Sequence, residues 1–213
     1  MIAVIDYGVG NLFSLQASLA YLGLQSVITD DPAVIDAADK VILPGVGAFG
    51  DAAGKLRRRG LETVLKRQKE AGKPLLGICL GMQLLLEESD EYGRHRGLGY
   101  IKGKVCSLEE DLAALAAAGS DPALPRKVPH MGWSALGFVR AGDPLLKYIR
   151  EGDYVYYVHS FYAKDCQESL VAVSEYGVTV PGIVRSGNVW GCQFHPEKSG
   201  KVGLAILQAY GRL

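Results

Sequence analysis

The chain has 213 residues, of which 48% are hydrophobic and 22% are charged, a composition typical of a folded globular domain. Lysine plus arginine and aspartate plus glutamate each number 23, so the balanced charge gives no indication of binding to nucleic acid or to an anionic membrane. The N-terminus lacks the basic region and cleavage site of a signal peptide, and no apolar run approaches the ~18 residues of a membrane span. We therefore expect a single domain, residues 1–213, located in the cytoplasm.

The first part of the chain alternates short apolar segments with amphipathic ones. Strands are predicted at residues 2–5, 24–29 and 40–43, and helices at 12–22, just after 30–32, and from about 47 to 71. Strands that alternate with helices predict a parallel sheet covered on both faces. Gly8 and Gly10 follow the first strand, but Phe13 stands where a dinucleotide-binding turn has its third glycine, so this turn gives little support for a nucleotide cofactor.

Residues 73–88 combine a short apolar strand with a helix that begins near Leu80 and runs to Glu88. Between the two lies Gly77-Ile-Cys79-Leu-Gly81, which has the spacing of the G-x-S-x-G nucleophile elbow with a thiol in place of the hydroxyl. Glycines suit a turn too tight for a Cβ atom, and the N–H groups at a helix start favour a thiolate. Most free cysteines are small buried hydrophobic residues, but strand, motif and helix together favour Cys79 as a nucleophile.

The second half of the chain has a different pattern. A helix is predicted at residues 108–119, a surface loop at 120–125 and a C-terminal helix at 199–210, with strands at 154–159, 170–176, 179–185 and 189–194. No internal repeat and no linker divides the chain. The elements together predict one three-layer α/β domain, in which a central mixed, mostly parallel sheet carries helices on both faces and a nucleophile elbow.

A thiolate nucleophile needs a base, and the base needs an orienting group. His195 lies in the segment Gln-Phe-His-Pro-Glu, where Pro196 restricts the backbone between the imidazole and the Glu197 carboxylate. A carboxylate bound to one ring nitrogen would leave the other nitrogen facing the thiol. His130 and His159 remain alternatives for the base.

The tetrahedral intermediate of acyl transfer also needs N–H donors for its oxyanion. In elbow hydrolases one donor is the residue after the nucleophile, here Leu80, and another comes from a glycine-rich loop after an earlier strand. Pro44-Gly-Val-Gly47 occupies the position of that loop, although the segment is equally consistent with a plain strand-to-helix turn. The four cysteines, at positions 79, 106, 166 and 192, are far apart and form no C-x-x-C pair, so we expect no metal and no disulfide framework.

These residues describe a Cys-His-Glu acyl-transfer enzyme. The segments Gly-Ile-Cys79-Leu-Gly-Met-Gln83 and His195-Pro-Glu197 resemble those of the class I glutamine amidotransferases. Over essentially the whole chain, the resemblance is to the glutaminase subunits of imidazole glycerol phosphate synthases. The segments that carry this closer resemblance lie at residues 6–14, 44–49 and 129–133.

The resemblance implies that Cys79 attacks the side-chain amide of glutamine, and that His195, oriented by Glu197, protonates the departing ammonia and then activates water. It implies that ammonia passes to a separate (β/α)₈ cyclase subunit in a heterodimer, with no cofactor. The other implied roles are oxyanion binding by Gly47 and Leu80, glutamine binding by Gln83, Ser160 and Phe161, and partner contacts by Asn11 and Trp133.

Ser134 departs from the resemblance, because the family usually has asparagine after His-Met-Gly-Trp. This position is expected nearer the partner surface than the thiol. Two alternatives remain open. One is the glutaminase of pyridoxal phosphate synthase, whose loop normally reads Pro-Gly-Gly-Glu-Ser-Thr where this chain has Pro44-Gly-Val-Gly-Ala-Phe49. The other is a non-catalytic binding module on the same fold, which would be expected to have lost one of Cys79, His195 and Glu197.

Overall fold

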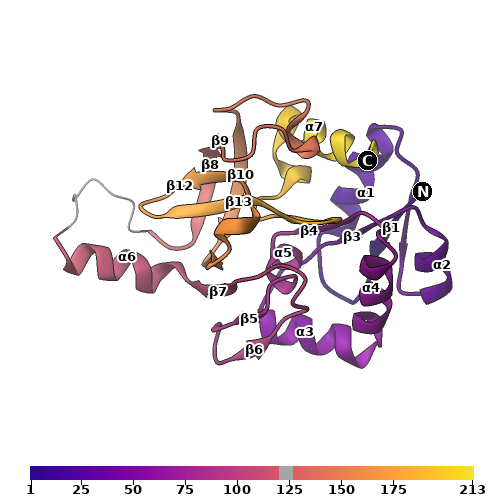
Figure 1. Ribbon diagram of the computed structural model, residues 1–213, viewed down its shortest axis with the longest axis horizontal. Helices are drawn as coiled ribbons and strands as arrows, with labels where there is room; N and C mark the ends of the chain where they lie inside the picture. The colour runs from indigo at the N-terminus through magenta and orange to yellow at the C-terminus, as the bar shows by residue number, and fades with distance from the viewer. Residues whose placement is uncertain (120–126) are drawn as a thin grey trace.

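A central eight-stranded sheet, with strand order β2-β1-β3-β4-β14-β13-β12-β9, runs through the computed structural model (Figure 1). The structure describes residues 1–119 and 127–213. The strands of this sheet are β1 (Ile2–Ile5), β2 (Ser26–Thr29), β3 (Lys40–Leu43), β4 (Leu75–Ile78), β9 (Gly137–Phe138), β12 (Leu170–Glu175), β13 (Thr179–Ser186) and β14 (Val189–Cys192).

The five strands from β2 to β14 pair in parallel, and the three beyond β14 are antiparallel. The prediction of a mixed, mostly parallel central sheet is therefore confirmed. Parallel strands need long crossover connections, which the helices between β1, β2, β3 and β4 supply. The antiparallel strands β12, β13 and β14 follow one another directly, as short connections allow.

Helices cover both faces of the sheet (Figure 1). In β1, Ile2 and Val4 pack into one hydrophobic core, whereas Ala3 and Ile5 pack into the other, as the two-residue period of a strand requires. The first core contains residues of α1 (Leu12–Tyr21) and α7 (Gly200–Gly211). The second contains residues of α2 (Pro32–Ala37), α3 (Phe49–Arg58), α4 (Leu61–Glu70) and α5 (Leu80–Leu84).

Two smaller sheets accompany the central one. The four-stranded sheet has the order β11-β7-β5-β6, and the two-stranded sheet pairs β8 with β10. Their strands are β5 (Glu88–Ser89), β6 (His95–Arg96), β7 (Lys104–Ser107), β8 (His130–Ala135), β10 (Tyr154–His159) and β11 (Phe161–Lys164). The strand predicted at 154–159 exists as β10 and pairs with β8 outside the central sheet.

Two predicted helices are shorter than expected. The helix predicted from 47 to 71 is divided into α3 and α4 at Gly60, whose φ of +69° takes the chain out of the helical region. The helix predicted to reach Glu88 ends at Leu84, because the carbonyl groups of residues 84–86 accept hydrogen bonds from the N–H groups of residues 98–101 instead of continuing the helix.

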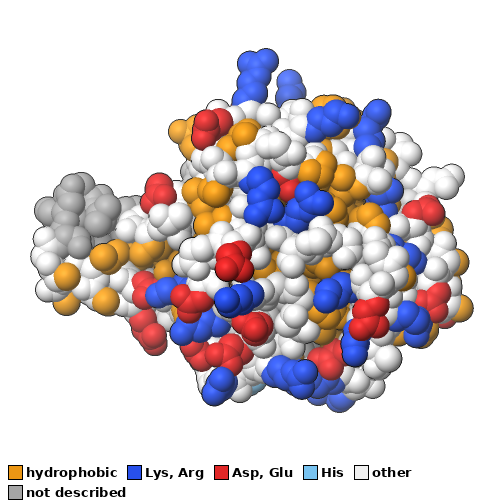
Figure 2. Space-filling view, viewed as in Figure 1, with side chains coloured by type: hydrophobic (Ala, Val, Ile, Leu, Met, Phe, Trp, Pro, Cys, Tyr) orange, Lys and Arg blue, Asp and Glu red, His pale blue; other side chains and the backbone are white. Residues whose placement is uncertain are grey.

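Helix α6 (Leu108–Ala117) projects from the body of the molecule and begins at Ser107, whose hydroxyl accepts a hydrogen bond from the Glu110 N–H group (Figure 1). The predicted loop at 120–125 lies outside the described residues. Within 1–119 and 127–213, no helix has the length and apolarity needed to cross a membrane. Acidic and basic side chains are interspersed on the face shown in Figure 2, in keeping with their equal numbers.

The turn between β4 and α5 depends on three glycines that lie against one another. A Cβ atom on Gly81 would lie 1.8 Å from the Leu43 carbonyl oxygen, and one on Gly45 would lie 2.7 Å from the Gly81 nitrogen. A Cβ atom on Gly77 would lie 2.7 Å from the Gly81 carbonyl group. The start of α5 therefore packs backbone to backbone against the loop after β3, at a distance that only glycine permits.

We expect Gly81→Ala to lower the free energy of unfolding by about 1–3 kcal/mol or more, because the added methyl group must displace the backbone of β3. Gly142→Ala is the matched control, since its Cβ atom would meet no atom within 4 Å. That variant should stay within about 0.5 kcal/mol of the wild type. Chemical denaturation of both proteins measures the difference, and equal stabilities would contradict the packing described for the turn.

Candidate active site

The parallel pair β4 and β14 brings Cys79 and His195 to the same edge of the sheet. Cys79 follows β4 directly, and its N–H group continues the ladder by donating to the Cys192 carbonyl at 2.7 Å. His195 follows β14 after two residues, and its N–H group donates to the Tyr156 carbonyl at 3.1 Å. The carboxyl ends of parallel strands are where α/β sheets place their ligand sites.

Cys79 has a backbone conformation that non-glycine residues rarely adopt. Its φ is +53° and its ψ is −111°, and it immediately precedes α5. Such strained residues persist only where the surrounding structure over-determines them, and they concentrate at functional sites. The side chain is buried but lines a pocket, so the thiol reaches the edge of the sheet as a nucleophile elbow requires.

His195 and Glu197 form a buried pair beside the thiol. The imidazole Nδ1 lies 2.9 Å from the Glu197 Oε1 atom, and both side chains are only 3% exposed. Burial by itself would lower the pKa of His195. Its hydrogen bonds to Cys79 and Glu197, with the charges of these groups, outweigh burial and raise that pKa to about 9. These partners therefore favour the protonated form of His195.

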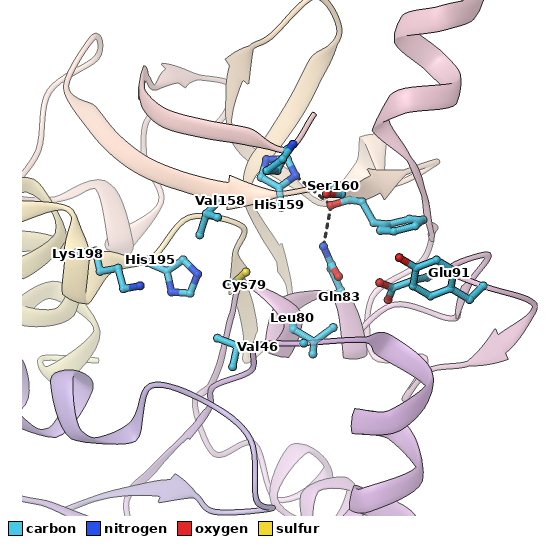
Figure 3. A pocket seen from close by; sticks show the side chains of 14 residues that line it. Val46, Cys79, Leu80, Gln83, Glu91, Val158, His159, Ser160, His195 and Lys198 are labelled. Carbon is cyan, nitrogen blue, oxygen red and sulfur yellow. Dashed lines mark hydrogen bonds between the residues drawn. The ribbon is translucent and has the colours of Figure 1, made fainter. Parts of the chain in front are cut away.

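The pocket in front of the thiol has a volume of about 370 Å³. His195 lies on one side of Cys79 and Gln83 on the other, with Glu91 at the far end (Figure 3). Seven of the residues predicted for catalysis, oxyanion binding or substrate binding line this pocket: Gly47, Cys79, Leu80, Gln83, Ser160, Phe161 and His195. Glu197 is hydrogen-bonded to His195 Nδ1, where a triad has its orienting group.

The predicted oxyanion residues line the same pocket as the thiol and come from a helix and a loop. Leu80 is the first residue of α5, and Gly47 lies in the loop between β3 and α3. Gly47 has a φ of +98°, which is open to glycine and strained for other residues. The Tyr7 hydroxyl anchors the start of this loop by donating to the Pro44 carbonyl at 2.7 Å.

A buried hydrogen-bond chain leads from the thiol to the predicted substrate residues. The Gln193 side-chain nitrogen lies 3.8 Å from the Cys79 sulfur, and the Gln193 oxygen accepts from the Gln83 side chain at 3.0 Å. Gln83 also donates to the Phe161 carbonyl at 2.8 Å (Figure 3). Gln83 is therefore held between α5, the end of β14 and the start of β11.

The two alternative histidines face each other and leave the thiol to His195. His130 Nδ1 lies 3.0 Å from His159 Nε2, and His159 Nδ1 lies 3.0 Å from the Phe161 carbonyl oxygen. Burial lowers the pKa of His130 to about 4, and burial with the neighbouring His130 lowers the pKa of His159 to about 3. Both rings are therefore neutral at pH 7, and both nitrogens of His159 are already occupied.

Asn11 and Trp133 lie outside the pocket. Asn11 precedes α1, and Trp133 on β8 is 54% exposed, with its ring edge-on to Tyr156 at 5.8 Å. Trp133 is therefore a surface residue and not part of the core. Within the described part of the chain, no group of three or more metal-ligating side chains is placed to bind a metal ion.

Sequence reasoning did not single out three polar residues at this site: Glu91, Gln193 and Lys198. The spacing to His195 could have identified Gln193, because residues two apart in an extended segment point to the same side. Glu91 lies in the turn between β5 and β6, which was not predicted. It accepts from the Phe49 N–H group at 2.6 Å, and burial raises its pKa.

Comparison with known proteins agrees with this geometry. The model of the family "Glutamine amidotransferase class-I" matches residues 3–209. Imidazole glycerol phosphate synthase subunit HisH of Listeria monocytogenes is 49% identical over 99% of this chain and 94% of that protein. The protein of the same name from Bacillus licheniformis is also 49% identical, over 99% of this chain and 95% of that protein.

Solved structures share the fold at low sequence identity. A crystal structure of a glutamine amidotransferase superposes with a TM-score of 0.71 at 19% identity, covering 99% of this chain and 100% of that one. The structure of PurLQS from Thermotoga maritima superposes with a TM-score of 0.68 at 22% identity, covering 98% of this chain and 96% of that one. The family match and the near full-length relatives together show that this chain belongs to the class I glutamine amidotransferases and, within them, to the HisH subunits of imidazole glycerol phosphate synthase.

Proposed function

We propose that this chain hydrolyses glutamine to glutamate and ammonia through a glutamyl thioester on Cys79. We further propose that it delivers the ammonia to a (β/α)₈ cyclase subunit, which makes imidazole glycerol phosphate and aminoimidazole carboxamide ribonucleotide in histidine biosynthesis. The observation that carries the proposal is the strained Cys79 beside the buried pair of His195 and Glu197. The compartment we propose is the cytoplasm, and four free cysteines suit its reducing conditions.

In the first step the Cys79 sulfur attacks the side-chain amide carbon of glutamine. The carbonyl oxygen becomes an oxyanion, for which Gly47 and Leu80 are the proposed N–H donors. The raised pKa of His195 keeps a proton on its imidazole, and that proton goes to the nitrogen as the C–N bond breaks. Ammonia leaves, and the glutamyl group remains bound to sulfur as a thioester.

In the second step the now neutral His195 removes a proton from water. The resulting hydroxide attacks the thioester carbon, the C–S bond breaks, and glutamate leaves with the thiolate of Cys79 restored. Glu197 remains hydrogen-bonded to His195 Nδ1 throughout, so the other nitrogen faces the reacting atoms in both steps.

The shape of the pocket orients glutamine. In the proposed complex its amide end meets Cys79 and His195, and its α-carbon end extends toward Gln83 and Glu91, which lie on the other side of the thiol (Figure 3). Ser160 and Phe161 form the wall beside Gln83. We propose that Glu91 receives the α-ammonium group, because its carboxylate lines the far end of the pocket and, among the described residues, one of its oxygens accepts from the Phe49 N–H group and the other is available.

The proposed partner surface includes Asn11 and Trp133. Exposed indoles are enriched among the residues that contribute most to protein interfaces. An isolated glutaminase would release ammonia into water, where it is protonated and no longer nucleophilic. We therefore propose that the cyclase controls turnover through the loop from Pro44 to Gly47, in which a peptide can present either its C=O or its N–H group to the oxyanion.

Loss of the nucleophile should abolish hydrolysis. We expect Cys79→Ala to lower glutamate release on the order of 10⁴-fold or more, as removal of a triad nucleophile does. Cys106→Ala is the matched control, because Cys106 lies on β7 and does not line the Cys79 pocket. An enzyme-coupled glutamate assay with the cyclase partner present measures both variants, and substantial activity in Cys79→Ala would rule out the thioester.

The Glu197 carboxylate should control the pH range of activity. Because it helps to raise the pKa of His195 to about 9, the alkaline limb of kcat/KM in the wild type should lie near that pH. Glu197→Gln keeps a hydrogen-bond acceptor but removes the charge, so the limb should move to lower pH and kcat should fall by about 10²–10⁴-fold. An alkaline limb that does not move in Glu197→Gln would contradict this role of Glu197.

His195→Ala should lose nearly as much activity as Cys79→Ala.

The lone chain should turn over glutamine slowly and become fast when the ligand-loaded cyclase is added. In that complex, alanine at position 47 would be strained at the φ of +98°, so the Gly47→Ala peptide should turn its N–H group away from the oxyanion and lower the rate by about 10²–10³-fold, the cost of one misplaced oxyanion donor. Gly152→Ala is the control, because Gly152 has a similar φ of +88°, against +98° for Gly47, and also has open space around it. Full turnover by the lone chain, unchanged by the partner, would contradict the switch.

A further inference from the structure

A second hydrogen-bond chain reaches the pocket wall from the surface strand β8. Ser134 Oγ lies 2.9 Å from His130 Nε2, and His130 Nδ1 lies 3.0 Å from His159 Nε2. His159 Nδ1 then lies 3.0 Å from the Phe161 carbonyl oxygen. The chain crosses from β8 to β10 at directly paired residues, since His130 and His159 are opposite each other in the two-stranded sheet.

The protons of this chain can be ordered in only one direction while both rings are neutral. The Phe161 carbonyl can only accept, so His159 carries its proton on Nδ1 and accepts at Nε2. His130 must then carry its proton on Nδ1 and accept at Nε2, where the Ser134 hydroxyl is the donor among the described residues. The direction of all three bonds therefore follows from one carbonyl group.

The surroundings keep both rings neutral and fixed. His130 is 1% exposed and His159 is 6% exposed. His130 stacks between Tyr157 and Tyr176, with ring centroids 4.6 Å and 3.9 Å away. Burial also lowers the pKa of both rings, so both stay neutral and one proton order persists through the neutral pH range.

The carbonyl group at the end of the chain is shared with the proposed glutamine site. Phe161 O accepts from His159 and, at 2.8 Å, from Gln83. Two donors satisfy both lone pairs of the oxygen, so the peptide after Phe161 is fixed against rotation. Gln83 depends on the same oxygen for one of its two bonds, and its other bond leads through Gln193 toward the thiol.

We propose that Ser134, His130 and His159 act as positioning residues that set the Phe161 carbonyl, and through it Gln83, for glutamine binding. The inference rests on the proposed function, because it assigns a task to the wall of that same pocket. It gives Ser134, a half-buried residue outside the pocket, control over substrate affinity through the direction in which its hydroxyl donates. A side chain that donates at position 134 preserves the direction of the three hydrogen bonds. A side chain that only accepts reverses that direction.

The affinity test measures glutamine binding by calorimetry at pH 8.5. All variants carry Cys79→Ala, so that no turnover occurs. Ser134→Asn and Ser134→Thr keep a donor and should hold Kd within about twofold. Ser134→Asp can only accept, so His130 must turn its proton to Nε2, His159 must follow, and two lone pairs then meet at Phe161 O. Loss of a hydrogen bond to this buried carbonyl should raise Kd on the order of tenfold.

A double-mutant cycle separates this chain from a general structural effect. In His159→Asn, the side-chain nitrogen takes the place of Nδ1 and still donates to Phe161 O, but the link to His130 is cut. The Kd of His159→Asn is therefore the reference for this arm of the cycle, and adding Ser134→Asp to it should have no further effect. A Ser134→Asp penalty that persists in the His159→Asn background would overturn the inference.

Nitrogen-15 NMR of the histidine rings tests the proton order without any substrate. Both His130 and His159 should be neutral and protonated at Nδ1 in the wild type, and His130 should be protonated at Nε2 in Ser134→Asp. Wild-type His130 protonated at Nε2 would overturn the inference. If the wild type with its cyclase fails to hydrolyse glutamine, the proposed function fails. Normal turnover with an unchanged Kd in Ser134→Asp rejects only the positioning role.

Discussion

The parallel pairing of β4 with β14 is the contact on which the candidate active site depends. It joins segments so distant in the chain that the Gln193 to Cys79 contact spans 114 positions. Because both strands run in the same direction, their carboxyl ends meet at one edge of the sheet, and the residues that follow them face each other across a single pocket. A shift of register between these strands would separate Cys79 from His195 by a full residue step.

The strained thiol is held in place by the same pairing. The Cys79 N–H group is bonded to the carbonyl of Cys192, the last residue of β14, while its carbonyl accepts from the Gln83 N–H group at 3.1 Å in α5. The contact of Gly81 with the backbone of β3 prevents the helix from moving away from the sheet. A positive φ at a non-glycine residue costs of order 1–3 kcal/mol, and these contacts are what offset it.

The buried pair His195–Glu197 and the buried pair His130–His159 have opposite electrostatic properties. His195 lies between Cys79 and Glu197, and these partners hold its proton despite burial. His130 and His159 contact each other, neutral hydrogen-bond partners and tyrosine rings, so burial, together with the nearby His195 in the case of His159, keeps them neutral. One pair can therefore exchange protons with a substrate, and the other can only direct hydrogen bonds.

Most of the fold was predictable because its signals are local. Alternating apolar and amphipathic segments predicted the parallel half of the sheet, and Gly-x-Cys-x-Gly between a strand and a helix predicted the elbow at Cys79. The four-stranded sheet was not predictable, because β5 and β6 have two residues each and exist only through pairing with β7. The end of α5 was not predicted for the same reason, because the carbonyl groups of residues 84–86 accept hydrogen bonds from the N–H groups of the distant residues 98–101.

Short-range patterns in the sequence were enough to identify the proposed catalytic side chains: a thiol at a turn that needs glycines, and a histidine next to a carboxylate two residues away. Those relations are short in the chain, so residue order and backbone geometry suffice for them. Only the tertiary structure decided that His195, and not His130 or His159, faces Cys79, and that Gln193 and Glu91 complete the pocket. Those choices depend on which strands pair and which rings are buried together, and both are properties of the packed chain.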